Sequence, residues 1–175
     1  MAKISFPKVT GSLKKAMEAS GVRLKETLTS EKVEKAIIEY LDENNVLHLA
    51  TVSKDNEARA TPIEYRNKGL TIYLFSEGGT KITNIKNNPK VSVSIASPYN
   101  RHKDYFGSRG LQIWGKAYVY TKKDNPDVFK ECLSVMKIEE GMLPSDFLFK
   151  VIKIEPERAK YMDARKGYWS VTWVK

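Results

Sequence analysis

The feature that most constrains this chain is a series of short strand-like segments joined by connections of only a few residues. Residues 46–53, 58–66 and 70–76 follow one another, separated by "KDNE" and "NKG". Within 70–76, large aliphatic residues recur at every second position, which is the period of a strand. Connections this short cannot hold the crossover that parallel strands need. The sequence therefore predicts an antiparallel sheet.

The rest of the chain continues this pattern and adds few helices. Further strands are expected at 90–97, 110–121, 147–156, 158–165 and in the closing "GYWSVTWVK", and helices at 30–41, 80–87 and 125–137. Residues 98–109 have no periodicity and are expected to form a loop. Six or more strands with few helices, in roughly 145 residues, favour a closed or nearly closed barrel. The predicted fold class is thus mainly β with flanking helices.

The first residues of the chain differ from the strand-rich remainder. A length of 175 residues favours a single domain. Residues 1–28 hold six Lys or Arg residues against two Glu, and "SLKKAMEAS" can form one basic amphipathic helix ended by Gly21. We therefore expect a basic N-terminal extension at 1–28 and a barrel domain at 29–175.

The net charge of +9, from 30 basic and 21 acidic residues, is large for this size. It is compatible with nucleic acid, an acidic membrane surface or a phosphorylated ligand as partner. The basic residues are scattered, which is typical of a solvated surface. The N-terminal segment lacks interleaved aromatic residues to stack on bases, so nucleic acid is disfavoured. Such binding would depend steeply on salt and would be lost on deleting residues 1–28.

Several classes of protein are disfavoured by what the sequence lacks. No apolar stretch approaches the roughly 20 residues of a membrane span, and the N-terminus does not resemble a secretory signal. The single cysteine, Cys132, allows no intrachain disulfide and no cysteine-based zinc site, which fits a reducing cytoplasm. Lying within a helix, it is expected to be buried and inert. We identify no metal site and no catalytic residue.

The stretch "SEGGTK" has the features of an anion site. A helix beginning at Thr80 would offer unpaired N–H groups and a partial positive charge, and Gly78 and Gly79 would let the backbone approach a ligand closely. Thr80 adds a hydroxyl donor and Lys81 a full charge, so together they can hold a phosphate. Arg59 begins the strand expected to form a hairpin with 70–76, which would bring it near Lys81. A simple turn and a solvated edge arginine are the alternatives.

The order of these motifs is similar to that of a known family. Arg-x-x-Pro in "RATPIE", the strand "LTIYLFS", Thr-Lys opening a helix, "NNP", the alternating "KVSVSIA" and "GLQIWGKAYVY" follow in sequence. This set resembles the FMN-binding split-barrel family, the pyridoxamine 5′-phosphate oxidase-like proteins. The resemblance covers about residues 30–121, with looser agreement to about 163.

The resemblance implies a homodimer of six-stranded antiparallel split β-barrels with FMN at the subunit interface. Arg59 and Lys81 match the positions that hold the FMN phosphate, with Thr80 beside them. Leu74 and Phe75 match a pair that contacts the ring and the ribityl chain. The residues expected along the isoalloxazine ring are Ala60, Thr61, Pro62 and Ile63. Gln112 and Trp114, on the strand that would border the site from the other subunit, are further candidates, although the glutamine of the oxidases falls at Gly110 here.

The chain departs from the true oxidases in two places. The basic residue that holds the substrate phosphate in those enzymes is Glu64 here, which would repel it. The C-terminal Arg-x-His is missing from "RKGYWSVTWVK". Vitamin B6 oxidation is therefore not expected. The leading hypothesis is a cytoplasmic FMN-dependent oxidoreductase that passes electrons between reduced nicotinamide and a small-molecule acceptor. The alternative is a non-catalytic flavin, haem or deazaflavin binding module.

Two further groups have open roles. The first is a set of residues that could line a substrate pocket or the dimer interface: Tyr99, Arg101, Tyr105, Phe106, Tyr168, Trp169 and Trp173. The second is His48, which lies mid-strand between apolar residues. A hydrogen-bonded core histidine is the favoured interpretation of His48, over an acid–base group or a haem ligand.

Overall fold

The computed structural model describes residues 2–145 and 148–175. Its elements, in chain order, are β1 (Lys3–Ser5), α1 (Gly11–Ala19), α2 (Ser30–Asp42), β2 (Val46–Val52), β3 (Ala58–Glu64), β4 (Arg66–Lys68), β5 (Thr71–Ser76), α3 (Thr80–Asn87), β6 (Lys90–Ser97), β7 (Arg109–Thr121), α4 (Pro126–Met136), the 3-10 helix η1 (Glu140–Met142), β8 (Lys150–Asp163) and β9 (Tyr168–Val174).

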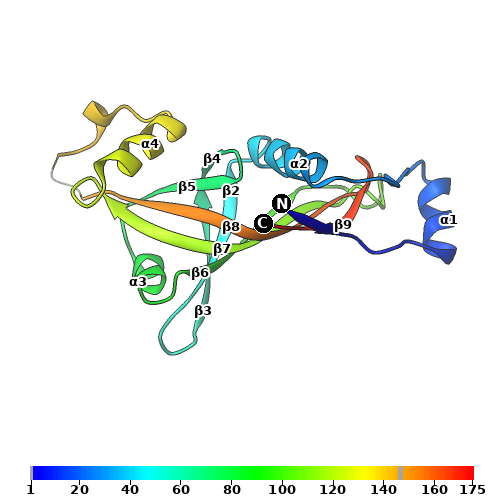
Figure 1. Cartoon of the computed structure of the whole chain (residues 1–175), viewed down its shortest axis with the longest axis horizontal. Coiled ribbons are helices and arrows are strands. Elements are labelled where there is room, and N and C mark those ends of the chain that lie inside the picture. The colour runs from blue at the N-terminus through cyan, green and yellow to red at the C-terminus, as the bar shows by residue number, and fades with distance from the viewer. Residues whose placement is uncertain (1, 146–147) are drawn as a thin grey trace.

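One antiparallel sheet organises the molecule. Its strands follow the order β1-β9-β8-β7-β6-β2-β3, and β5 pairs with β8 and with β4. The long strands β7 and β8 run along the length of the molecule, and the β2–β3 hairpin protrudes from it (Figure 1). Within the described residues β3 pairs with β2 alone, so the sheet curls without closing between β3 and β5. The predicted mainly β fold with a split antiparallel barrel is confirmed, and it is open on this side.

The helices begin where local chemistry favours a start. The side chain of Asn125 accepts a hydrogen bond from the Val128 backbone N–H at 3.1 Å, and Pro126 occupies the first position of α4, as the sequence predicted. For α2 the cap is Thr29, whose hydroxyl accepts from the Lys32 N–H at 3.3 Å. The expected cap, Ser30, is instead the first helical residue.

The main core lies between the curled sheet and α2. From α2 it takes Val33, Ile37 and Leu41, which are fully buried and share one helical face. The inner faces of β2, β5, β6, β7 and β8 supply the remaining residues, Leu47, Leu49, Ile72, Leu74, Val93, Ile113, Ile152 and Ile154 among them. Because successive strand residues alternate in direction, each strand leaves its other face outside this core.

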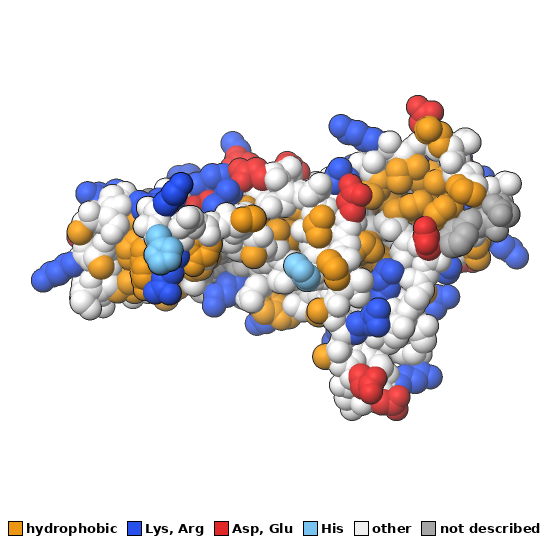
Figure 2. Space-filling model, turned by 180° about the vertical axis from the view of Figure 1, so that it is seen from behind, with side chains coloured by type: hydrophobic (Ala, Val, Ile, Leu, Met, Phe, Trp, Pro, Cys, Tyr) orange, Lys and Arg blue, Asp and Glu red, His pale blue; other side chains and the backbone are white. Residues whose placement is uncertain are grey.

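A second hydrophobic cluster forms at one end of the molecule. It packs Phe129, Cys132 and Leu133 of α4 against Tyr73 of β5 and Val151 of β8. Figure 2 shows hydrophobic side chains gathered on the surface at this end. Helix α1 lies at the opposite end (Figure 1).

The last two predicted barrel strands are one strand in the structure. Residues 150–163 form β8 without a break, so the prediction of separate strands at 147–156 and 158–165 is wrong; its start at residue 147 lies outside the described residues. The apparent break is Pro156, which stands where β8 changes partner from β5 to β9 and where the β7–β8 register shifts. A proline is tolerated at such an irregularity, since a bulge interrupts the hydrogen-bond ladder there.

The predicted strand 58–66 is interrupted in the structure. Tyr65 leaves the strand, is fully buried and donates its hydroxyl hydrogen bond to the Leu41 carbonyl at 2.8 Å. The partner of β5 in the following hairpin is β4, not β3. The predicted hairpin between the strand that holds Arg59 and β5 is therefore wrong, because these two strands do not pair.

None of the helices in the described ranges is long and apolar enough to cross a membrane.

Candidate functional site

The gap between β3 and β5 opens into a cleft of about 480 Å³. The lining residues come from β3, from the end of β5 and from the turn into α3: Ile63, Phe75, Ser76, Glu77, Gly78, Gly79 and Lys81. The cleft thus lies where the barrel is split and where the anion site was predicted from the sequence.

The turn at the head of α3 depends on its two glycines. Gly78 and Gly79 have φ angles of 143° and 92°, which side chains other than glycine rarely adopt. Buried Ser76 braces the turn, since its Oγ accepts a hydrogen bond from the Gly78 N–H at 3.2 Å. Gly79 occupies the N-cap of α3 and can offer no side-chain cap. The Ile82 N–H donates to the Gly79 carbonyl at 3.0 Å, whereas no side chain caps the N–H groups of Thr80 and Lys81, which can therefore face an anion.

Lys81 lies at this turn, and Arg59 of β3 is near enough to affect its pKa. The Lys81 Nζ donates a hydrogen bond to the Gly78 carbonyl at 2.8 Å and is half-buried. Burial lowers the pKa of Lys81, repulsion from Arg59 lowers it further, and Glu77 partly opposes the shift. The structure thus brings Arg59 and Lys81 close enough to repel each other, although β3 and β5 do not pair. A bound anion between them would relieve this repulsion.

Helix α3 is held against the sheet by a buried polar contact. The Asn84 side-chain amide donates a hydrogen bond to the Thr51 hydroxyl at 3.1 Å, and both residues are buried. Thr51 lies on β2 directly opposite Arg59 of β3, so this contact places α3 relative to the arginine. Sequence reasoning missed both residues. The available signal was an asparagine between Ile82 and Ile85, the two buried apolar residues of a short helix.

The two faces of β3 have different surroundings. Arg59, Thr61 and Ile63 share the inner face with Thr51, Leu49 and Leu47 of β2, whereas Ala60 and Pro62 face outward and are exposed. The Thr61 hydroxyl is buried and has no hydrogen-bond partner among the described residues. Among the described residues, β3 pairs on one side with β2, and its other backbone edge has no partner strand. A flat ligand with polar groups along its rim could satisfy both.

The other predicted contact residues are distributed unequally. Phe75 lines the cleft and stacks on Phe149, with ring centroids 4.8 Å apart. Leu74 is fully buried in the main core, so only its backbone can reach a ligand. Gln112 and Trp114 lie on the outer face of β7, which β6 and β2 separate from β3. The structure of one chain therefore does not bring these two residues to the cleft.

His48 is exposed, so its interpretation as a core histidine is wrong. Leu47 and Leu49 face the core, which leaves His48 on the outer face between Pro62 of β3 and Ser94 of β6. Cys132 is fully buried, and burial raises its pKa to about 12, which keeps the thiol protonated. Across the described ranges, no three or more His, Cys, Asp or Glu side chains gather as a metal site.

An open antiparallel barrel, with an uncapped helix N-terminus and two cations at its split, defines a split-barrel binding module. The chain belongs to the pyridoxamine 5′-phosphate oxidase family, whose model matches residues 33–163. No curated protein matches the chain.

Solved structures similar to this chain include one protein named for the same family and two named for haem. A proposed pyridoxamine 5′-phosphate oxidase from Listeria innocua is 27% identical, with a TM-score of 0.57, over 74% of this chain and 98% of that one. A haem-binding protein from Mycobacterium smegmatis (18%, TM-score 0.61) covers 86% of this chain, which spans 59% of that protein. The haem storage protein HutZ from Vibrio cholerae (18%, TM-score 0.59) matches over 77% and 98%. At 18% identity these two haem proteins show a shared fold.

Proposed function

We propose that the chain binds FMN, with the phosphate at the turn into α3. The observation that carries the proposal is the approach of Arg59 and Lys81 at a helix N-terminus that has no side-chain cap. Thr80 begins that helix and adds a hydroxyl donor. A phosphate dianion there would receive backbone N–H groups and two positive charges, which are the groups that proteins use to bind phosphate.

The cleft also fits the remainder of such a cofactor. The unpaired edge of β3 from Ala60 to Ile63 offers backbone donors and acceptors to the polar rim of the ring, and Thr61 adds its unpartnered hydroxyl. Phe75 supplies an apolar surface. When bound, FMN supplies the electron-transfer chemistry. The residues of this chain hold the phosphate, orient the ring and limit the access of water.

A homodimer is the proposed assembly, with the cofactor at the interface. The outer face of the β2–β3 hairpin supports it, because Val46 is 47% exposed there and Pro62 and Ala60 lie exposed on the neighbouring strand. In that arrangement Gln112 and Trp114 reach the cleft of the second copy. Light scattering on the purified protein is expected to give twice the 20.0 kDa chain mass. A mass of one chain would contradict this assembly.

The proposed activity is electron transfer between reduced nicotinamide and a small acceptor in the cytoplasm. Glu64 of β3 lies exposed and forms an ion pair with Arg66 at 3.1 Å. Its carboxylate supports a substrate other than a phosphorylated vitamer, since like charges would repel. Oxidation of reduced nicotinamide by the flavin-loaded protein, followed at 340 nm, tests the activity, and recovery in the soluble cytoplasmic fraction tests the location.

Haem is the second candidate cofactor. A deazaflavin, bound in the same cleft as FMN, is a variant of the first candidate. The exposed His48 on the outer face favours haem, because a neutral imidazole is a common haem ligand. Similarity to two proteins that are named for haem also supports haem as a cofactor.

The absorbance of the protein as purified decides between these cofactors. Flavin gives bands in the blue and near-ultraviolet, and haem gives a Soret band. Release and mass spectrometry of the chromophore identify it. A protein that lacks a chromophore and takes up no added FMN would refute the leading proposal. A Soret band that is lost in His48→Ala would favour the second.

A further inference from the structure

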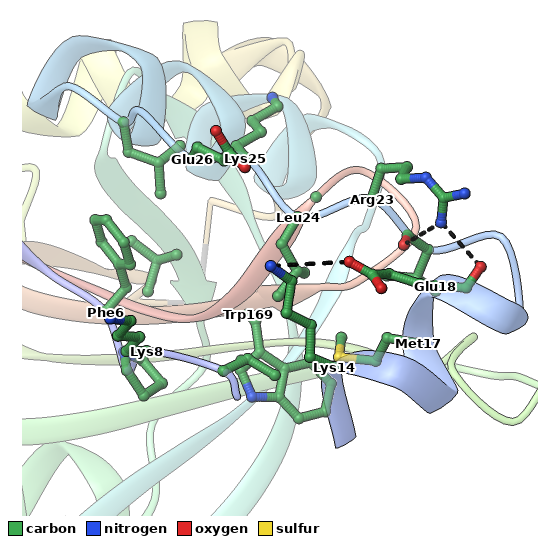
Figure 3. A pocket seen from close by; sticks show the side chains of 16 residues that line it. Phe6, Lys8, Lys14, Met17, Glu18, Arg23, Leu24, Lys25, Glu26 and Trp169 are labelled. Atoms are coloured by element: carbon green, nitrogen blue, oxygen red, sulfur yellow. Dashed lines mark hydrogen bonds and ion pairs between the residues drawn. The ribbon is translucent and has the colours of Figure 1, made fainter. Parts of the chain in front are cut away.

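A second pocket, of about 360 Å³ (Figure 3), lies beside α1, at the end of the molecule opposite α4 (Figure 1). It is enclosed by the N-terminal segment up to residue 28 and by the start of β9. All of its lining residues fall outside 33–163, the part that matches the family. It is also separate from the cleft at the head of α3, with which it shares no residue.

The walls of this N-terminal pocket are mainly apolar. Its apolar walls include Phe6, Met17, Val22, Leu24, Leu28 and Trp169. Met17 of α1 and Val22 are 1% and 2% exposed and belong to a small hydrophobic cluster that also contains Phe106 and Ala164. Phe106 meets the Trp169 ring edge-on at 6.4 Å between centroids. The N-terminal residues therefore pack as a folded wall against the barrel domain.

The backbone that forms the wall is fixed to the β8–β9 turn. The Lys25 N–H donates a hydrogen bond to the Gly167 carbonyl at 3.0 Å. Gly167 has a φ angle of 85°, and a Cβ there would lie 2.9 Å from the Arg23 carbonyl oxygen, so a glycine is required. The Arg165 guanidinium donates to the Ser20 carbonyl at 2.7 Å and pairs with Asp104. A pocket with walls held in this way is formed before any ligand arrives.

The rim of the N-terminal pocket is mainly cationic. It contains the basic residues Lys8, Lys14 and Arg23 and the acidic residues Glu18 and Glu26. The backbone of Lys25 also lines the pocket, but its ammonium donates to the Tyr168 hydroxyl at 2.7 Å, outside the pocket. Among residues 2–145 and 148–175, Lys14 pairs with Glu18 alone, at a long 3.8 Å, and its side chain is 57% exposed. Arg23 uses one nitrogen, Nη1, on the carbonyls of Glu18 and Val22 at 2.9 and 3.2 Å (Figure 3). Donors of both cations therefore remain for a ligand.

We propose that this N-terminal pocket binds a small monocarboxylic acid with an aliphatic or aromatic body. The apolar walls take the body, because burying it there removes hydrocarbon surface from water. The excess of cations at the rim selects a negatively charged head group. A neutral head group gains only the apolar contact, and a cationic one meets repulsion.

The test uses Trp169 as a reporter and three probes of equal chain length: octanoate, octanol and octylammonium. Because Trp169 lines the pocket, octanoate is expected to change the tryptophan emission saturably. The response should vanish in Trp169→Phe, which keeps Trp114 and Trp173 and an aromatic wall. Octanoate should bind more tightly than octanol, and octylammonium should bind most weakly.

A matched pair of lysine variants tests the role of charge. Lys14→Gln should weaken octanoate by up to about fivefold, the range of an exposed ion pair, and leave octanol unchanged. Lys35→Gln should change neither, since Lys35 has the same helical pairing, with Glu39 at 3.9 Å, but does not line the pocket. Equal affinity for the three probes, a response that persists in Trp169→Phe, or equal effects of the two lysine variants would overturn the proposal.

Discussion

Replacing Lys81 by glutamine should weaken FMN binding without weakening riboflavin binding. The Lys81 Nζ sits at the head of α3, half-buried, beside the Gly78 carbonyl that it contacts at 2.8 Å. Hydrogen bonds to charged groups contribute about 1.5–3 kcal/mol, and a half-buried ammonium falls near the middle of that range. A loss of about 2 kcal/mol corresponds to about a 30-fold weaker Kd. Riboflavin has no phosphate, so its affinity should stay the same.

Arg59 should contribute less to the free energy of FMN binding than Lys81 does. Arg59 is exposed, and salt screens exposed charges, so we assign it about 0.2–1 kcal/mol. The double variant with Lys81→Gln and Arg59→Gln should then lose roughly 40- to 160-fold in FMN affinity. Quenching of flavin fluorescence on titration measures both ligands with the same protein samples.

The control for this experiment lies on the same helix. Lys86 is an exposed lysine in the last turn of α3, and Lys86→Gln removes the same charge away from the cleft. It should leave the Kd of FMN within about twofold of the unmodified protein, since an exposed charge at this distance is screened. If Lys81→Gln weakened FMN and riboflavin equally, or weakened neither, the phosphate would not lie at this turn.

Four further outcomes are expected. FMN affinity should fall as pH rises through the lowered pKa of Lys81, because the bound phosphate needs the protonated amine. Lys81→Arg should flatten this dependence of FMN affinity on pH. The same dependence in Lys81→Arg and in the unmodified protein would contradict this role of Lys81. Cys132 should resist a thiol reagent at pH 8 in the native protein and react after unfolding, because its pKa is raised to about 12. Asn84→Ala should cost about 1–3 kcal/mol in unfolding free energy and also weaken FMN, since α3 loses its buried link to β2. Gly115→Ala should lower the Tm, with a cost of about 1–3 kcal/mol, because its Cβ would overlap the backbone of β8, whereas Gly110→Ala, with 3.5 Å to its nearest neighbour, should be milder.

Much of the fold could be predicted from the pattern of apolar residues. Alternation predicted β5 and β6, and the Asn-Pro-Asp start predicted α4, because these signals act within a few residues. The predictions failed where distant segments decide. Pro156 looked like the end of a strand, yet β7 pairs along both sides of it. His48 looked like a core residue, because a sequence shows the period of a strand but not which of its faces is covered.

The candidate site divides in the same way. The sequence by itself determined the glycine turn, the hydroxyl and amine that open α3, and the antiparallel order of strands, because these depend on backbone preference and on connections too short for a crossover. Only the tertiary structure decided that β3 approaches α3 without pairing to β5, that Asn84 ties α3 to β2, and that Leu74 lies in the core while Phe75 faces the cleft. Each of these depends on contacts between residues far apart in the chain, and local pattern carries no information about them.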